Sequence, residues 1–250
     1  MHSLEKRNTA RELFLLGKSK KAIAELLGVS RATVREWCAG DLPSDSPEFR
    51  TARCCRCTDP PAPPADEPSY AYLLGQYLGD GHVTVTERVP KLRIACAADY
   101  PDIMDEVERA MRAVLARSVF RVKAPGCYQV GSYSKHWPCL FPQVGRGTKH
   151  SRRIVLADWQ EELVERHPRP LLRGLIHSDG SRSLNTIRTP TATYAYPRYL
   201  FANESVDILG ICGAALDRIG ARWRFNRRNS ISVATRADVA LLDEFIGPKT

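Results

Sequence analysis

Residues 73–81 (LLGQYLGDG) and 172–180 (LRGLIHSDG) decide the fold of this 250-residue chain. Each stretch ends in Asp-Gly, and Asp179 follows Asp80 by 99 residues. Aligning the two aspartates also superimposes the small residues of the stretches, which are Gly75, Gly79, Gly174 and Ser178. Small residues one turn apart on a helix let two backbones approach closely. The pair of stretches therefore predicts two helices packed side by side along a pseudo-two-fold axis.

The same succession of elements is expected after each stretch. Period-2 alternation, as in RWRFN at 222–226, predicts strands. The predicted order is strand, strand, helix, strand, strand, helix, at 82–87, 91–97, 100–116, 118–123, 127–133 and 135–142 in the first copy, and at 181–188, 193–201, 204–219, 221–227, 230–235 and 237–246 in the second. A further helix is expected at 158–166. The fold class is α+β, with tandem ββαββα repeats.

This arrangement, over residues 70–246, resembles the LAGLIDADG (dodecapeptide) homing endonucleases in their single-chain, two-motif form. The resemblance implies a saddle of two sheets along the DNA major groove, with Asp80 and Asp179 as catalytic ligands of Mg²⁺ (or Mn²⁺) beneath it. Two neighbouring carboxylates repel each other unless cations neutralise them. The alternative is that each Asp only caps an Asp-Gly turn. His177 is expected to pack behind its helix rather than act as a general base.

The charge is unevenly distributed. The chain has 37 Lys and Arg against 28 Asp and Glu, a formal net charge of +9. Residues 117–153 and 218–237 contain no acid, whereas acids gather at 102–108 and 158–165. A basic sheet with acidic helices suits a polyphosphate partner, although arginines also decorate solvent-exposed strands. The resemblance makes these strand residues candidate DNA contacts: Arg93, Arg121, Lys123, Arg182, Arg188, Arg222, Arg224 and Arg227.

Members of the family that cleave DNA usually keep a lysine near each metal site. Lys123 is the candidate in the first half. In the second half there is no lysine between Lys149 and Lys249, so Arg227 or Arg228 would take this place. A guanidinium does not give up a proton and would act there only as a fixed charge.

Residues 1–40 are predicted to form three short helices. Gly28 supplies a tight corner, and Ser30 caps the third helix. The pattern resembles the helix-turn-helix of resolvases and bacterial regulators, whose third helix enters the major groove. The resemblance implies DNA contacts from Ser30, Arg31, Thr33 and Arg35, with Lys20 and Lys21 reaching phosphates. The alternative is a three-helix packing module that binds nothing.

The predicted linker, residues 41–69, is rich in proline, which disfavours regular structure. Cys54 and Cys57 form a Cys-x-x-Cys pair that supplies two of the four ligands of a structural zinc site. The alternative is a pair of exposed thiols. The predicted repeats then span 70–157 and 158–250.

Composition and motifs together leave two functions. The first is a metal-dependent endonuclease for double-stranded DNA. The alternative is a non-cleaving bacterial transcription regulator that uses the helix-turn-helix and the saddle as DNA clamps. No apolar run is long enough to span a membrane, and scattered cysteines favour the cytoplasm, with the protein on the nucleoid. A monomer is expected, since two motifs in one chain already make the pseudo-dimer.

Overall fold

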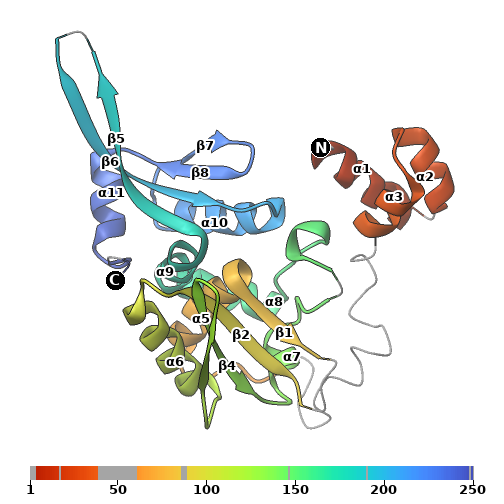
Figure 1. Ribbon diagram of the computed structural model, residues 1–250, viewed down its shortest axis with the longest axis horizontal. Coiled ribbons are helices and arrows are strands. Elements are labelled where there is room, and N and C mark those ends of the chain that lie inside the picture. Colours follow the sequence, from red (N-terminus) through yellow and green to blue (C-terminus); the bar gives the residue numbers. More distant parts are fainter. Residues whose placement is uncertain are drawn as a thin grey trace.

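The structure, a computed structural model, describes residues 4–16, 18–38, 61–85, 89–145, 147–189, 191–247 and 249. Its centre is a pair of helices, α5 (Glu67–Asp80) and α9 (Pro168–Asp179), which pack along each other between two sheets (Figure 1). Helix α5 is buried on all sides from Tyr70 to Leu78, as expected for a helix in the middle of a core. Residues 73–81 and 172–180 are therefore neighbours in space.

Two four-stranded antiparallel sheets have the same strand order. The first is β1-β2-β4-β3 and the second is β5-β6-β8-β7. Their bounds are β1 (Gly81–Thr84), β2 (Lys91–Ala97), β3 (Phe120–Ala124), β4 (Cys127–Tyr133), β5 (Gly180–Arg188), β6 (Thr193–Ala202), β7 (Arg224–Arg227) and β8 (Ser230–Val233). Identical order in the two sheets confirms the predicted α+β duplication.

The remaining helices of the two repeats are α6 (Pro101–Val114), α7 (Trp137–Leu140), the short 3-10 helix η1 (Lys149–Ser151), α8 (Asp158–Arg166), α10 (Val206–Arg218) and α11 (Arg236–Asp243). One hydrophobic core runs continuously from Tyr70 to Ile246, so the repeats form a single folded unit. Helix α5 includes the last three residues of the predicted linker, because the Asp66 carboxylate accepts a hydrogen bond from Ser69 N (2.9 Å) and caps the helix.

The two central helices cross at glycine. A Cβ atom built on Gly75 would lie 2.5 Å from Leu171 O, and one on Gly174 would collide with Tyr72 O. Further along, a Cβ on Gly79 would collide with the Ser178 side chain. The small residues predicted for the crossing thus lie at it, and contact between the two backbones brings the helix ends together.

Residues 4–38 form a separate three-helix module, α1 (Leu4–Leu15), α2 (Lys20–Leu27) and α3 (Arg31–Cys38), with its own core around Ile23, Val34 and Trp37. Gly28 has φ +60° and ends α2, and Ser30 Oγ accepts a hydrogen bond from Thr33 N (3.0 Å) at the start of α3. The turn chemistry is that expected from the sequence. Among the described residues, no helix combines the length and apolar character needed to cross a membrane.

Candidate functional site

Helices α5 and α9 each end in a carboxylate where the two sheets meet. Asp80 is exposed and Asp179 is half-buried. Asn203 Nδ2 donates a 2.6 Å hydrogen bond to Asp179 Oδ2. Partial desolvation, reinforced by the negative charge of Asp179, raises the pKa of Asp80 to about 6. Burial also raises the pKa of Asp179, while the Asn203 hydrogen bond opposes this. Both acids stand at helix C-termini, which also disfavour negative charge.

Lys149 lies beneath the end of α5. Its ammonium donates hydrogen bonds to Gly79 O (2.5 Å), to Gly81 O (2.9 Å) and to Tyr77 O. Burial lowers the pKa of Lys149 to about 8, although the carboxylates, Asp179 foremost, act in the opposite direction. The lysine therefore binds the helix of its own repeat while its charge acts most strongly on the aspartate of the other repeat.

Lys249 occupies the matching place in the second repeat. Its ammonium donates to Ser178 O (3.2 Å) and to Gly180 O at the end of α9. Burial lowers its pKa, and among the charges Asp80 acts most strongly against this. The centre is thus built from two carboxylates and two ammonium groups, with each ammonium bound to the carbonyls on either side of the aspartate of its own repeat.

Neither lysine was among the residues predicted from the sequence for this role. Lys123 is exposed on β3, Arg227 is exposed on β7, and Arg228 contacts Glu204 at 3.4 Å. One signal was present in the sequence: Lys149 follows Asp80 by 69 residues and Lys249 follows Asp179 by 70. The nearly equal spacing is the signal that relates the two lysines.

The donor set at this centre suits a hard divalent cation. The described residues contain no group of three or more His, Cys, Asp and Glu side chains that could hold a metal ion, so Asp80 and Asp179 are the carboxylates that would hold a cation here. Mg²⁺ commonly binds in this way, through one or two carboxylates with water and phosphate oxygens. The pKa values of Asp80 and Asp179 are raised because their ionised forms are unfavourable here, and a bound cation would stabilise those forms. Cys54 and Cys57, the suggested zinc ligands, lie outside the described residues.

A pocket of about 550 Å³ opens beside Asp179 and Lys149. Its lining also includes His82 of β1 and Asn203. Burial, followed by the charges of Arg93 and Lys149, lowers the pKa of His82. A neutral imidazole at this position can accept a proton or a hydrogen bond. The space is wide enough for a phosphate group and ordered water.

Strand register determines which arginines face away from the helices. We call that side of each sheet the open face. In β2, Leu92 and Ile94 are buried, so Arg93 between them points to the open face. In β6, Tyr199 is buried, which places Arg198 on the open face. In β8, the buried Ile231 and Val233 face the helices, so Ser230 and Ser232 lie on the open face. Arg227 and Arg224 pair with these two serines and therefore lie on the open face as well. Arg198 is an addition to the predicted set.

Three predicted DNA contacts lie on the opposite side of the sheets. Arg121, a candidate DNA contact, forms ion pairs with Asp105 and Glu108 of α6 (both 2.7 Å). Arg182 contacts Asp243 of α11 (2.7 Å), and Arg222 contacts Asp238 at the same helix (3.1 Å). These guanidiniums neutralise the acidic helices behind the sheets. Lys123 is two residues from Arg121 in β3 and so lies on the same side of the sheet. The structure does not describe the side chain of Arg188.

The three-helix module presents its predicted contacts at the surface. Arg31, Arg35 and Lys21 are exposed. The Ser30 and Thr33 hydroxyls hydrogen-bond each other (2.8 Å), and Lys20 Nζ lies 5.0 Å from the centroid of the Phe14 ring. Exposure leaves both arginines of α3 accessible to a ligand.

His177 packs behind α9, as expected. Its Nε2 donates a 2.8 Å hydrogen bond to Ile246 O, and its Nδ1 lies 3.3 Å from the Tyr72 hydroxyl. Burial, followed by the charge of Arg173, lowers its pKa from 6.5 to about 4. The ring is therefore neutral at pH 7, and its Nδ1 also lies 3.7 Å from Glu106 Oε2.

This buried histidine predicts a pH dependence of stability. Its contribution is fully present above pH 6.5 and is lost as the pH falls towards 4, because only the unfolded chain binds the proton in that range. Between pH 7 and pH 4 the wild type should lose about 3 kcal/mol of unfolding free energy relative to His177→Gln. Urea denaturation at several pH values measures the difference, and parallel curves for the two proteins would refute it.

Comparisons with known proteins give similarities to two kinds of protein. A family described as "Putative ATPase subunit of terminase (gpP-like)" matches residues 5–45, which covers the three-helix module alone. No curated protein matches the chain.

Solved structures are similar over the repeats. Mesophilic variants of the homing endonuclease I-DmoI are 14% identical, with 73% of this chain and 97% of that chain covered and a TM-score of 0.47. The LAGLIDADG meganuclease I-AabMI, bound to uncleaved DNA, is 12% identical, with coverages of 70% and 82% and a TM-score of 0.45. Full-length DUF199/WhiA from Thermatoga maritima is 13% identical, with coverages of 72% and 55% and a TM-score of 0.45. These likenesses concern the fold and say nothing of cleavage.

Proposed function

We propose that this chain binds double-stranded DNA on the open faces of its two sheets and hydrolyses a phosphodiester in each strand with the help of a divalent cation, Mg²⁺ or Mn²⁺. The observation that carries the proposal is the set of Asp80, Asp179, Lys149 and Lys249 where the helices end. A structural pair of Asp-Gly turns would not require a half-buried ammonium on the carbonyls at the end of each helix. Burying a lysine is costly unless its charge is used.

Each component has a chemical role in this proposal. Asp80 and Asp179 would hold the cation, which when bound lowers the pKa of water and stabilises the negative charge of the leaving oxygen. Water attacks phosphorus, the P–O bond to one deoxyribose breaks, and the leaving oxygen takes up a proton. The ammonium groups of Lys149 and Lys249 lie where they can stabilise charge on the phosphate, and a lysine with a pKa near 8 can also transfer a proton.

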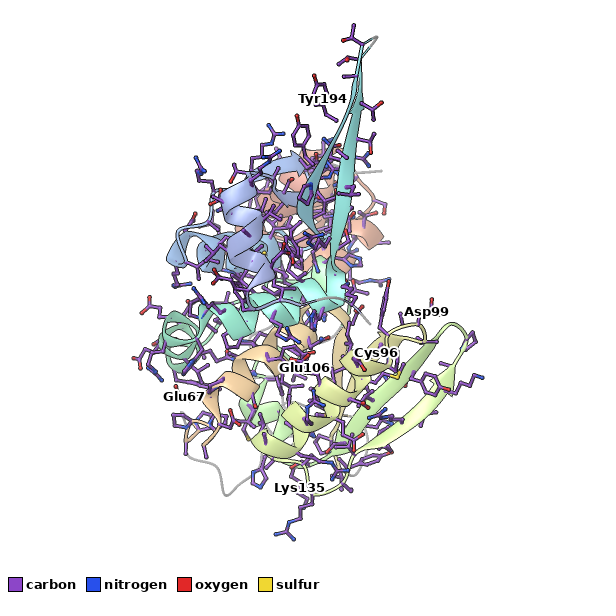
Figure 2. All side chains as sticks on the ribbon, turned by 90° about the vertical axis from the view of Figure 1, so that its left-hand side faces the viewer. Glu67, Cys96, Asp99, Glu106, Lys135 and Tyr194 are labelled. Atoms are coloured by element: carbon purple, nitrogen blue, oxygen red, sulfur yellow. The ribbon has the colours of Figure 1, made fainter. Side chains whose placement is uncertain are left out.

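The open faces supply the DNA-binding surface. Arg224 and Arg227 are exposed, and within the described residues neither forms an ion pair. The long β5–β6 hairpin extends beyond the second sheet and carries Tyr194 towards its tip (Figures 1 and 2). Tyr194 and Tyr196 stack on each other with ring centroids 6.2 Å apart. A two-stranded ribbon of this kind has the dimensions to enter a major groove.

Substitutions on opposite sides of the second sheet test this surface. Arg224→Ala and Arg227→Ala should each weaken DNA binding and reduce the slope of log K against log salt by about 0.9 if a phosphate contact is lost. Arg182→Ala and Arg222→Ala remove the same charge from the helix side and should leave the slope unchanged. Fluorescence anisotropy at several salt concentrations measures both. If the open-face and the helix-side substitutions changed the slope equally, the open face would not be the DNA-binding surface.

The function itself is tested by selecting tight-binding sequences from random duplex DNA and assaying the selected site in a supercoiled plasmid. The proposal expects cleavage that requires Mg²⁺ or Mn²⁺ and stops with a chelator. A selected site that is bound tightly but never nicked with either cation would overturn the proposal of cleavage.

That last outcome would favour the second candidate, a transcription regulator without cleavage. The observation on its side is the three-helix module with an exposed Arg31 at the start of α3 and an exposed Arg35 in its last turn, which can direct the chain to a promoter. Enrichment of promoter sequences in the same selection distinguishes this candidate from a protein with no sequence preference.

A further inference from the structure

The segment after α11 carries Lys249 back to the carboxylates. We call residues 245–247 and Lys249 the strap. Arg173 of α9 holds its backbone by donating to Phe245 O (2.7 Å) and to Ile246 O. His177, one turn further along α9, donates to Ile246 O as well. At Gly247 the chain turns with φ +70°, and Lys249 then reaches the end of the same helix.

Arg173 is itself held in place by α6. Its guanidinium forms a two-pronged ion pair with Glu106, with Nε–Oε1 at 2.6 Å and Nη2–Oε2 at 2.8 Å. Glu106 lies where α6 approaches the central helices (Figure 2). A planar guanidinium bound on two sides has little freedom to rotate. The strap is thus fixed to a rigid wall of two helices.

His177 is oriented by the other central helix. The Tyr72 hydroxyl lies 3.3 Å from His177 Nδ1, and Gln76 Nε2 donates to that hydroxyl (2.9 Å). Since Gln76 supplies one proton to the oxygen, the hydroxyl proton is left for His177 Nδ1, which fixes Nε2 as the donor to the strap.

The first repeat holds its lysine differently. Buried Arg152, three residues after Lys149, donates to Gln143 O in the segment that precedes the lysine. At the positions equivalent to Arg173 and His177, the first repeat has Leu74 and Leu78, both fully buried. The polar clamp on the motif helix therefore belongs to the second repeat alone.

We propose that Arg173, locked by Glu106, is a positioning residue that keeps Lys249 on the carbonyls of Ser178 and Gly180 at the end of α9, so that one of the two strand cuts depends on the strap and the other does not. This inference rests on the proposed function. Lys149, with its own support from Arg152, serves the other cut. The two halves of the centre are consequently separable by substitutions remote from the carboxylates.

The test uses the full chain and a plasmid carrying the selected site, with each strand labelled separately. Arg173→Gln should slow the cut of one strand by about 10²-fold, the effect of displacing a catalytic group by about 1 Å, and leave the other within about two-fold, so nicked circles accumulate. Arg152→Gln is the matched control and should slow the opposite strand. Glu106→Gln, a milder change that keeps the shape of the side chain, should affect the same strand as Arg173→Gln to a smaller extent. Equal slowing of both strands by Arg173→Gln and Glu106→Gln would overturn the inference.

Hydrogen exchange provides a readout that does not depend on cleavage. In Arg173→Gln, the amides of residues 245–247 and 249 should exchange faster, while those near Lys149 keep the protection of the wild type. Unchanged exchange in the strap would overturn the inference. If the wild type cuts neither strand, the proposed function fails, and faster exchange confined to the strap still supports the positioning of Lys249 by Arg173.

Discussion

Asp80→Asn and Asp179→Asn are each expected to reduce cation-dependent cleavage by roughly 10³-fold or more, the scale of removing a residue that acts as part of a catalytic unit. Asparagine has nearly the same size and cannot supply the charge that holds a cation. Binding to the selected DNA should be retained or become tighter, because a negative charge facing phosphates is removed. Cleavage rates and anisotropy on the same duplex measure the two effects.

Asp99→Asn is a suitable control for this prediction. Asp99 is exposed in the turn that follows β2, so the substitution removes one negative charge from the first repeat without touching the helix ends. It should cleave at the rate of the wild type. If Asp80→Asn and Asp179→Asn also cleave at that rate, the two carboxylates only cap turns and the catalytic centre lies elsewhere.

The same Asp80 substitution should stabilise the protein when no cation is present. A carboxyl whose pKa rises from 3.8 to about 6 on folding is favourable below pH 4, and its contribution is lost as the pH rises through 6. After allowance for solvent screening of this exposed group, Asp80→Asn should gain about 1 kcal/mol at pH 8 in a chelator and nothing at pH 4. Adding Mg²⁺ should remove the difference.

Gly174→Ala is expected to have the largest effect on stability. The new methyl group would collide with Tyr72 O and lie 3.0 Å from Gln76 N. Both are backbone atoms of a buried helix, so no side chain can move aside. A loss of about 3 kcal/mol or more is expected, which lowers the melting temperature by roughly 6–12 °C for a chain of this size. Thermal and urea denaturation measure it.

Gly210→Ala is the matched control. Gly210 lies on the exposed side of α10, where an added Cβ meets nothing within 4 Å. Alanine there should stabilise the protein by about 0.5–1 kcal/mol, since glycine is the poorer helix former. Equal effects from the two alanines would show that the helices do not cross at Gly174.

The contrast between Arg224 and Arg222 shows where prediction from the sequence ended. Both were candidate DNA contacts on the same strand pattern, yet Arg222 precedes β7 and turns to Asp238, whereas Arg224 pairs with Ser232 on the open face. The two arginines are two residues apart, so alternation alone predicts the same face for both. The difference arises because β7 begins only at Arg224, and the point at which strand pairing begins is set by the partner strand and not by alternation within one strand.

The sequence by itself determined the duplication, the central helices and the two aspartates at their ends. These features rest on local spacing: small residues one turn apart, Asp-Gly at a helix end, and alternation along short strands. Only the tertiary structure decided which arginines lie on the open faces and which lysines reach the ends of the central helices. Lys149 and Lys249 reach the carboxylates from about 70 residues downstream, through packing of whole elements against each other, and no local pattern encodes that approach.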